Sequence, residues 1–175
     1  MNDLAALHAS ASDDAARLRF SMRNLPLLEG GATMELLGLS PMLWAHSKVY
    51  SSGGENALHS HDIEDHVFLI LQGEATFHFG DGSTTQVRAF EGVTVPRGTR
   101  YSFQANEAGG NLVMFRVGAA LVKDSSELDP KFAIPREALQ SRRDPSGGYA
   151  AGDARKNGAA SQPTVFKAGA FFAPD

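Results

Sequence analysis

The sequence has no cysteine, no long apolar run and no excess of positive charge, and each absence narrows the possible functions. Without cysteine there are no disulfides and no thiolate ligands, so any metal site must use His, Asp, Glu or Tyr. The 16 Lys and Arg against 20 Asp and Glu give a net charge of −4, which argues against nucleic acid as a partner. No apolar run approaches the ~20 residues of a membrane span, and the acidic start lacks the pattern of a secretory signal. We therefore expect a cytoplasmic protein without a membrane partner.

The chain divides by composition into three parts, and the middle part is predicted to hold the folded domain. Residues 1–30 contain helix-like stretches and form an N-terminal extension. In residues 31–122, short runs rich in Val, Ile, Phe and Thr alternate with Gly, Pro and Asn, which is typical of an antiparallel sandwich or barrel. Asp81-Gly82 is the clearest hairpin turn. Residues 123–175 form a C-terminal extension with a predicted short helix, a loose polar arm and an apolar end, TVFKAGAFF.

The stretch ALHSHDIEDHVFLILQG, residues 57–73, places three histidines in front of an apolar run. Alternate residues of a strand face the same side, so His59 and His61 point into one space, and His66, Phe68 and Ile70 form the inward row of the next strand. If the two strands pair as a hairpin, the three imidazoles converge. Neutral imidazoles are good ligands for Fe(II), Zn(II), Ni(II) or Cu(II). The alternative is a solvent-facing loop in which the histidines have no role.

The same stretch resembles the first motif of the cupin superfamily, G-x5-H-x-H-x3,4-E-x6-G. Gly53, His59, His61 and Gly73 carry the match. The resemblance extends over roughly residues 32–120 and implies an all-β fold, a small antiparallel jelly-roll barrel with any metal inside one end. The predicted fold is therefore this barrel with short helical extensions at both ends.

The second cupin motif, G-x5-P-x-G-x2-H-x3-N, is matched only in part, through Pro96 and Gly98. The glutamate position of the first motif falls on His66, and the histidine position of the second falls on Tyr101. The ligand tetrad that the resemblance implies would therefore read His59, His61, His66 and Tyr101.

A face of three histidines leaves positions open on a divalent ion, an arrangement that some cupin dioxygenases use for Fe(II). We expect one divalent ion per chain, Fe(II) by preference, with Zn(II), Ni(II), Mn(II) or Cu(II) also compatible. The predicted function is a non-haem Fe(II) dioxygenase acting on a small oxygenated or aromatic compound, and an anionic substrate would suit the charge of the ion. A non-redox lyase or isomerase and a non-catalytic binding barrel are the alternatives. Tyr101 is predicted to be catalytic, as a proton donor beside the metal; a distant ligand or an ordinary barrel aromatic are the other interpretations.

Other polar residues give weaker signals. Glu64 could replace the missing carboxylate ligand if the strand starts early, and is otherwise a turn residue. Arg100 and Arg116 could bind a substrate carboxylate or be surface charges. His46 is a core or surface histidine or lines the pocket, and His78 should face outward. The expected apolar lining is Phe68, Ile70, Phe77, Phe79, Val95, Phe103 and Met114.

The extensions bear on association, because open sheet edges need pairing or a cover. The apolar end follows an arm long enough to reach a neighbouring subunit. We expect a homodimer that exchanges strand edges or the tail. The alternative is a tail that folds back on its own barrel.

Overall fold

The computed structural model describes residues 19–40, 42–51, 57–61, 64–106, 110–120, 142–143 and 165–173. Within these ranges the regular structure is β-strand, and every strand pair is antiparallel, so the predicted all-β class is confirmed. No described residue belongs to a helix of the length and apolarity that a membrane crossing requires. The helix-like stretch predicted before residue 19, and the part of the C-terminal extension before residue 142 where a short helix was predicted, lie outside the described residues.

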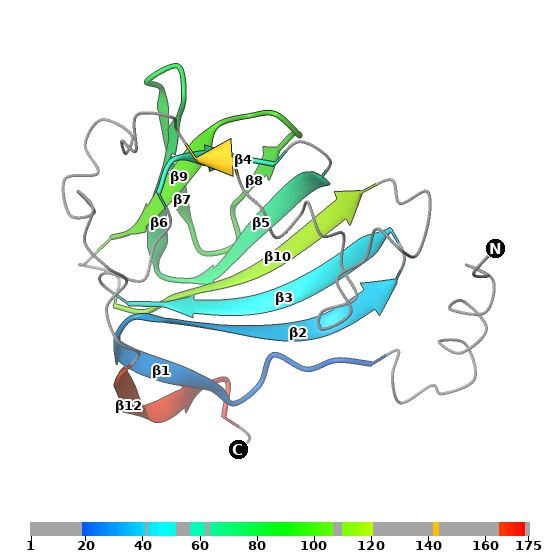
Figure 1. Ribbon diagram of the computed structural model, residues 1–175. Helices are drawn as coiled ribbons and strands as arrows, with labels where there is room; N and C mark the ends of the chain where they lie inside the picture. The colour runs from blue at the N-terminus through cyan, green and yellow to red at the C-terminus, as the bar shows by residue number, and fades with distance from the viewer. Residues whose placement is uncertain are drawn as a thin grey trace.

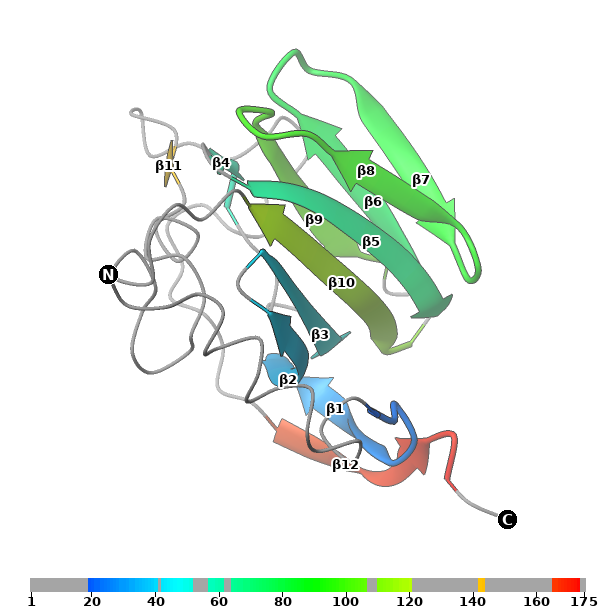
Figure 2. The same ribbon diagram turned by 90° about the vertical axis from the view of Figure 1, so that its right-hand side faces the viewer.

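Two five-stranded sheets face each other and enclose the core, as in a jelly-roll barrel (Figures 1 and 2). The first sheet has the order β2 (Ala32–Ser40), β3 (Leu43–Tyr50), β10 (Leu112–Ala120), β5 (Glu64–Gln72) and β8 (Gly92–Val95). The second has the order β11 (Arg142–Arg143), β4 (His59–Ser60), β9 (Tyr101–Ala105), β6 (Glu74–Phe79) and β7 (Thr84–Arg88). Figure 2 shows β6, β7 and β9 lying behind β5, β8 and β10.

The core forms where alternate residues of both sheets point inward, as the alternation predicts. Aromatic rings from the two sheets pack at the centre: the Phe68 and Phe77 centroids are 5.3 Å apart, and those of Phe77 and Phe103 are 5.4 Å apart. The predicted lining is confirmed, with Phe79 only partly buried. The buried members of the cluster are Tyr50, Phe68, Ile70, Ala75, Phe77, Val87, Val95, Tyr101, Phe103, Ala105, Leu112 and Met114.

The predicted hairpin turn at Asp81-Gly82 is confirmed and joins β6 to β7. The backbone N–H of Phe79 donates to the carbonyl of Ser83 at 2.9 Å, and Gly82 has a φ of +87°. The Asp81 carboxylate accepts from the Ser83 N–H at 2.9 Å. The turn therefore uses a residue without a Cβ where a left-handed backbone is required.

A third, two-stranded sheet pairs the two extensions, β1 (Leu25–Gly30) with β12 (Val165–Phe171). It lies along the outer face of the first sheet at the bottom of Figure 1. Its apolar residues Leu25, Leu28 and Phe171 pack against Val49 and Val113, which point outward from β3 and β10. The N-terminal extension therefore contains a strand that the sequence analysis did not predict, and the apolar end of the C-terminal extension is its partner.

One prediction of pairing was wrong: residues 57–61 and 66–72 do not form a hairpin. β4 pairs with β9, where His59 is opposite Tyr101, whereas β5 pairs with β10 and β8. The chain crosses from one sheet to the other between β4 and β5, and the jelly-roll closure then brings their inward residues together across the barrel.

A candidate metal centre

The polar residues of the interior gather at one end of the barrel. Register places His66 of β5 beside Gly118 of β10, and His46 of β3 beside Arg116, at the same end of the first sheet. The side chains at this end, drawn from both sheets, are all buried or nearly so: His46, Lys48, His59, His61, Glu64, His66, Tyr101 and Arg116. The apolar core fills the opposite end.

Three of these residues form a group that could hold a metal ion. One ligand atom each from His61, Glu64 and His66 can be chosen so that all lie within 4.8 Å of one another. Glu64 Oε1 is 2.5 Å from His61 Nδ1 and 2.8 Å from His66 Nε2. The interpretation of Glu64 as a turn residue was wrong, because it begins β5 and is 1% exposed.

The polar atoms of this group are incompletely satisfied by the protein. Among the residues that the structure describes, Glu64 Oε2 and His61 Nδ1 are buried without a hydrogen-bond partner, although His61 Nδ1 lies close to Oε1. That contact is short but is not aligned as a hydrogen bond. Buried polar atoms without partners are costly, and two imidazoles with a carboxylate are a donor set that divalent metals bind. The residues present therefore fit a divalent ion.

The protonation states also suit metal ligands, which must be deprotonated. Burial alone would raise the pKa of Glu64, but its contacts with His61 and His66 and the charge of Arg116 lower that pKa to about 2. Burial lowers the pKa of His66 to about 3. At neutral pH the carboxylate is ionised and the His66 imidazole is neutral.

His59 lies beside the group rather than in it. Its ring centroid is 5.1 Å from that of His61 and 4.6 Å from that of Tyr101. Its Nδ1 is 2.6 Å from the Ala57 carbonyl, to which it donates, so Nε2 keeps its lone pair. The three predicted histidines do meet in the interior, and ligation by His59 stays a prediction.

Arg116 reaches into the group from β10. Its side chain is 11% exposed, and its Nη2 is 2.6 Å from His66 Nε2 and 3.4 Å from Glu64 Oε1. Its guanidinium also lies 5.9 Å from the centre of the Phe68 ring. The surface-charge interpretation was therefore wrong for Arg116. Arg100 lies elsewhere, half-buried beside Gly80 before β9.

β3 adds two buried groups, one of which the sequence analysis missed. His46 is buried and points inward, so it lines the interior, and burial lowers its pKa to about 4. Lys48 donates from Nζ to the Tyr50 hydroxyl at 3.0 Å. Burial, with the charge of Arg116, lowers the pKa of Lys48 to about 7. The alternation of Trp44, His46 and Lys48 could have identified this inward row.

Tyr101 forms the boundary between the polar end and the apolar core. It is 2% exposed, and its hydroxyl is 3.1 Å from His66 Nδ1. Its ring lies 5.6 Å from that of Phe68, and burial raises the pKa of its hydroxyl. The structure thus places Tyr101 inside the barrel and next to the candidate ligands.

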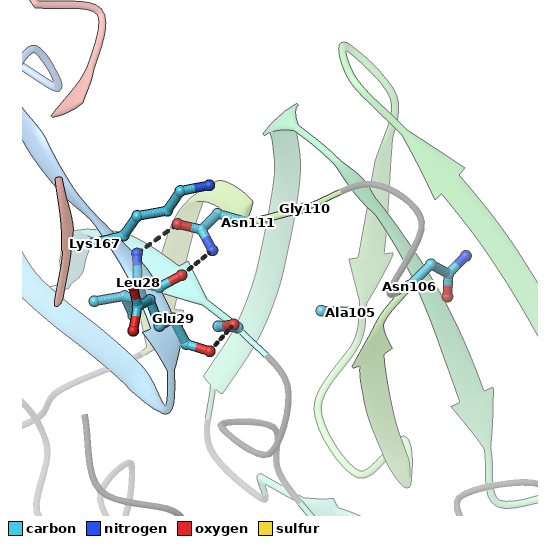
Figure 3. A pocket seen from close by; sticks show the side chains of 8 residues that line it. Leu28, Glu29, Ala105, Asn106, Gly110, Asn111 and Lys167 are labelled. Carbon is cyan, nitrogen blue, oxygen red and sulfur yellow. Dashed lines mark hydrogen bonds between the residues drawn. The ribbon is translucent and has the colours of Figure 1, made fainter. Parts of the chain in front are cut away.

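Two further polar features lie away from this centre. His78 points out of the barrel as predicted, opposite Ser102 in β9, although it is buried. A pocket of about 410 Å³ opens at the other end of the barrel, between β12, β1 and the start of β10 (Figure 3). There the Asn111 side chain accepts from Leu28 N–H and donates to Leu28 O, both at 2.6 Å. These two hydrogen bonds use the side-chain amide of Asn111 to hold β1 to the barrel.

Comparison with known proteins identifies the part of the chain that contains this centre. Residues 48–118 match the family described as the Cupin domain. This range includes the three grouped residues, Tyr101 and Arg116. No curated protein matches the sequence.

Several solved structures are similar at low identity. An RmlC-like cupin from Shewanella frigidimarina is 19% identical, with 61% of this chain and 92% of that chain covered and a TM-score of 0.48. The Cnp3 cupin domain of Schizosaccharomyces pombe is 21% identical, with 54% and 68% covered and a TM-score of 0.48. KdgF from Halomonas sp. is 19% identical, with 52% and 81% covered and a TM-score of 0.46.

Proposed function

This chain is a member of the cupin superfamily, with its cupin domain over residues 48–118, and we propose that it is a metal-dependent enzyme, a non-haem Fe(II) dioxygenase. The observation that carries the proposal is the group of His61, Glu64 and His66. Two histidines and one carboxylate with open positions form the donor set typical of non-haem Fe(II) oxygenases. His59, beside the group, is the candidate for a further ligand.

A divalent ion at this centre would polarise an oxygen of the substrate, and Fe(II) would in addition supply electrons to dioxygen. The protein's own residues would do the rest. Tyr101 is placed to hold or donate a proton through its hydroxyl next to His66. The rings of Phe68 and Phe77 below Tyr101 exclude water from that side.

The charge of the interior favours an anionic substrate. Arg116 and Lys48 are cations drawn from adjacent strands, and Glu64 is the one acid among the buried residues that the structure describes. A small compound with a carboxylate and a second oxygen would match both the cations and the metal. We therefore place diketones and phenolic acids first among substrates.

Oxygen consumption distinguishes the proposed reaction from its alternatives. Protein reconstituted with Fe(II) should consume dioxygen with at least one compound from a panel of diketones and phenolic acids, and the His61→Ala, His66→Ala double variant should not. Turnover that is unchanged in an anaerobic chamber would refute the dioxygenase.

A non-redox lyase or isomerase is the second candidate, and the observation that favours it is the pair of protonic groups in the interior. The Tyr101 hydroxyl contacts His66, and the Lys48 amine donates to the Tyr50 hydroxyl in the same interior. The pKa of Lys48 is lowered to about 7. A metal that polarises a carbonyl next to a general acid and a general base would suffice for proton transfer. This candidate predicts turnover without oxygen.

A further inference from the structure

We propose that Arg116 and the metal ion compete for His66, and that metal binding releases Arg116 to hold the carboxylate of the substrate. The inference rests on the proposed function and assigns Arg116 as a residue that determines specificity. It predicts that the metal and a carboxylate ligand each raise the protein's affinity for the other.

The competition follows from the hydrogen bonds of the His66 ring. Arg116 is a donor only, so we assign its 2.6 Å contact as donation to the lone pair of His66 Nε2, in the tautomer that has no proton on this nitrogen. The other nitrogen, Nδ1, then carries the proton and donates to the Tyr101 hydroxyl at 3.1 Å. A neutral imidazole has one lone pair, and that lone pair cannot serve Arg116 and a metal ion together.

In this tautomer a cation is needed between Glu64 and His66. With Nε2 as an acceptor, its 2.8 Å contact with Glu64 Oε1 brings two electron-rich atoms together. Arg116 Nη2, 3.4 Å from the same oxygen, supplies a compensating positive charge. A divalent ion bound to the same two atoms would do so more strongly, which makes the two cations alternatives at one position.

Arg116 would remain an internal cation after it is displaced. Its side chain is 11% exposed and its guanidinium lies against Phe68. Its Nε has no hydrogen-bond partner in the described part of the chain. Burying a charge without a partner is costly. A carboxylate matches the planar guanidinium with two parallel hydrogen bonds, so a small carboxylate that enters beside the metal would restore the lost pairing.

The test measures metal affinity with Co(II) as the probe, followed by visible absorption, with and without millimolar benzoate. Arg116→Gln should bind Co(II) ~10- to 100-fold more tightly than the wild type, because the hydrogen bond to a charged donor no longer competes. Benzoate should tighten Co(II) binding to the wild type ~5-fold or more and should have no effect on Arg116→Gln.

The matched control is Arg88→Gln. It makes the same substitution at a guanidinium that is 68% exposed and pairs with Glu74 on the neighbouring strand. It should leave both the Co(II) affinity and the benzoate effect as they are in the wild type. Arg116→Met provides a second variant if the glutamine variant misfolds, and circular dichroism checks both.

The outcomes separate this inference from the proposed function. The role of Arg116 is overturned, while the metal function stands, if Arg116→Gln and Arg116→Met bind Co(II) no more tightly than the wild type. It is likewise overturned if benzoate has the same effect on these variants as on the wild type. If neither the wild type nor any variant binds Co(II), both the role of Arg116 and the proposed metal function are overturned.

Discussion

Tyr101 is the residue through which the apolar core meets the candidate ligands. Its ring belongs to the buried cluster, and its hydroxyl contacts His66. A buried hydroxyl needs a partner in any protein, and here that partner is a candidate metal ligand. The position therefore combines a packing role with a chemical one, and a substitution that keeps the ring separates the two.

Tyr101→Phe should lower turnover ~10- to 1000-fold with the substrate that the oxygen assay identifies, because it removes a proton donor at the centre. Stability should fall by only ~1 kcal/mol, the contribution of one hydrogen bond. Steady-state rates and urea unfolding of the same preparations measure both. A variant with the rate of the wild type would leave Tyr101 a packing residue.

Lys48→Met should stabilise the protein in a way that depends on pH. The pKa of Lys48 is lowered from 10.5 to about 7 in the folded protein, so the unfolded chain holds the proton more tightly. Below about pH 7 both states carry it and the cost of burial is complete, whereas stability rises between about pH 7 and 10 as the folded state releases it. The variant should gain ~2 kcal/mol at about pH 6 and little at about pH 10. Urea unfolding at both pH values measures the gain, and an equal gain at both would show that Lys48 is not a buried charge.

Sequence alternation correctly placed His66 on the inward face of its strand but misjudged the charged residues beside it. His66, Phe68 and Ile70 share one face of β5, as the period of two requires. Glu64 and Arg116 follow the same period, yet charged residues are usually at the surface. Only the closure of the barrel shows that these two charges meet and compensate each other.

At the scale of elements, the sheet β1–β12 shows what local patterns cannot reveal. The apolar end TVFKAGAFF was recognised as a covering segment, but its partner lies more than a hundred residues earlier in the chain. Residues 25–30 have no strong alternation of their own, and β12 supplies the ladder that makes them a strand. The missed hairpin has the same origin, because strand pairing depends on contacts distant in sequence.

β12 provides a matched pair of substitutions that measures its contribution. Phe171 is 6% exposed and packs with Leu25, Leu28, Val49 and Val113, whereas Phe166 on the same strand is 63% exposed. Phe171→Ala should lower the free energy of unfolding by ~3 kcal/mol, and Phe166→Ala should change it by less than ~0.5 kcal/mol. Urea titration of both variants measures this. Equal losses of unfolding free energy would mean that the apolar face of the β1–β12 sheet does not hold it on the barrel.

At the scale of the whole molecule, one edge of the first sheet stays open among the described residues. β2 pairs with β3 on one side and is the last strand in its sheet. Its residues Met34 and Leu36 are 54% and 43% exposed, an apolar strip on an edge strand. Such edges are normally covered, and a second copy of the chain is the cover that we predict.

In light scattering the protein should therefore have the molar mass of a homodimer. The Met34→Asp, Leu36→Asp double variant should have the molar mass of a monomer. Phe90→Asp is the control, because Phe90 is 78% exposed and precedes β8, at the opposite edge of the first sheet from β2. This variant should stay dimeric. A monomeric wild type would refute the dimer. A dimer that survives the double substitution would place the interface elsewhere, exchange of the tail included.

The central claim, a metal centre made by His61, Glu64 and His66, is tested most directly by elemental analysis of protein purified without a histidine tag and reconstituted anaerobically with Fe(II). The account predicts ~1 equivalent of metal per chain for the wild type and for His78→Ala, whose imidazole lies outside the barrel. It predicts less than ~0.1 equivalent for the His61→Ala, His66→Ala double variant. A wild type that retains less than ~0.1 equivalent, or a double variant that retains as much metal as the wild type, would contradict it.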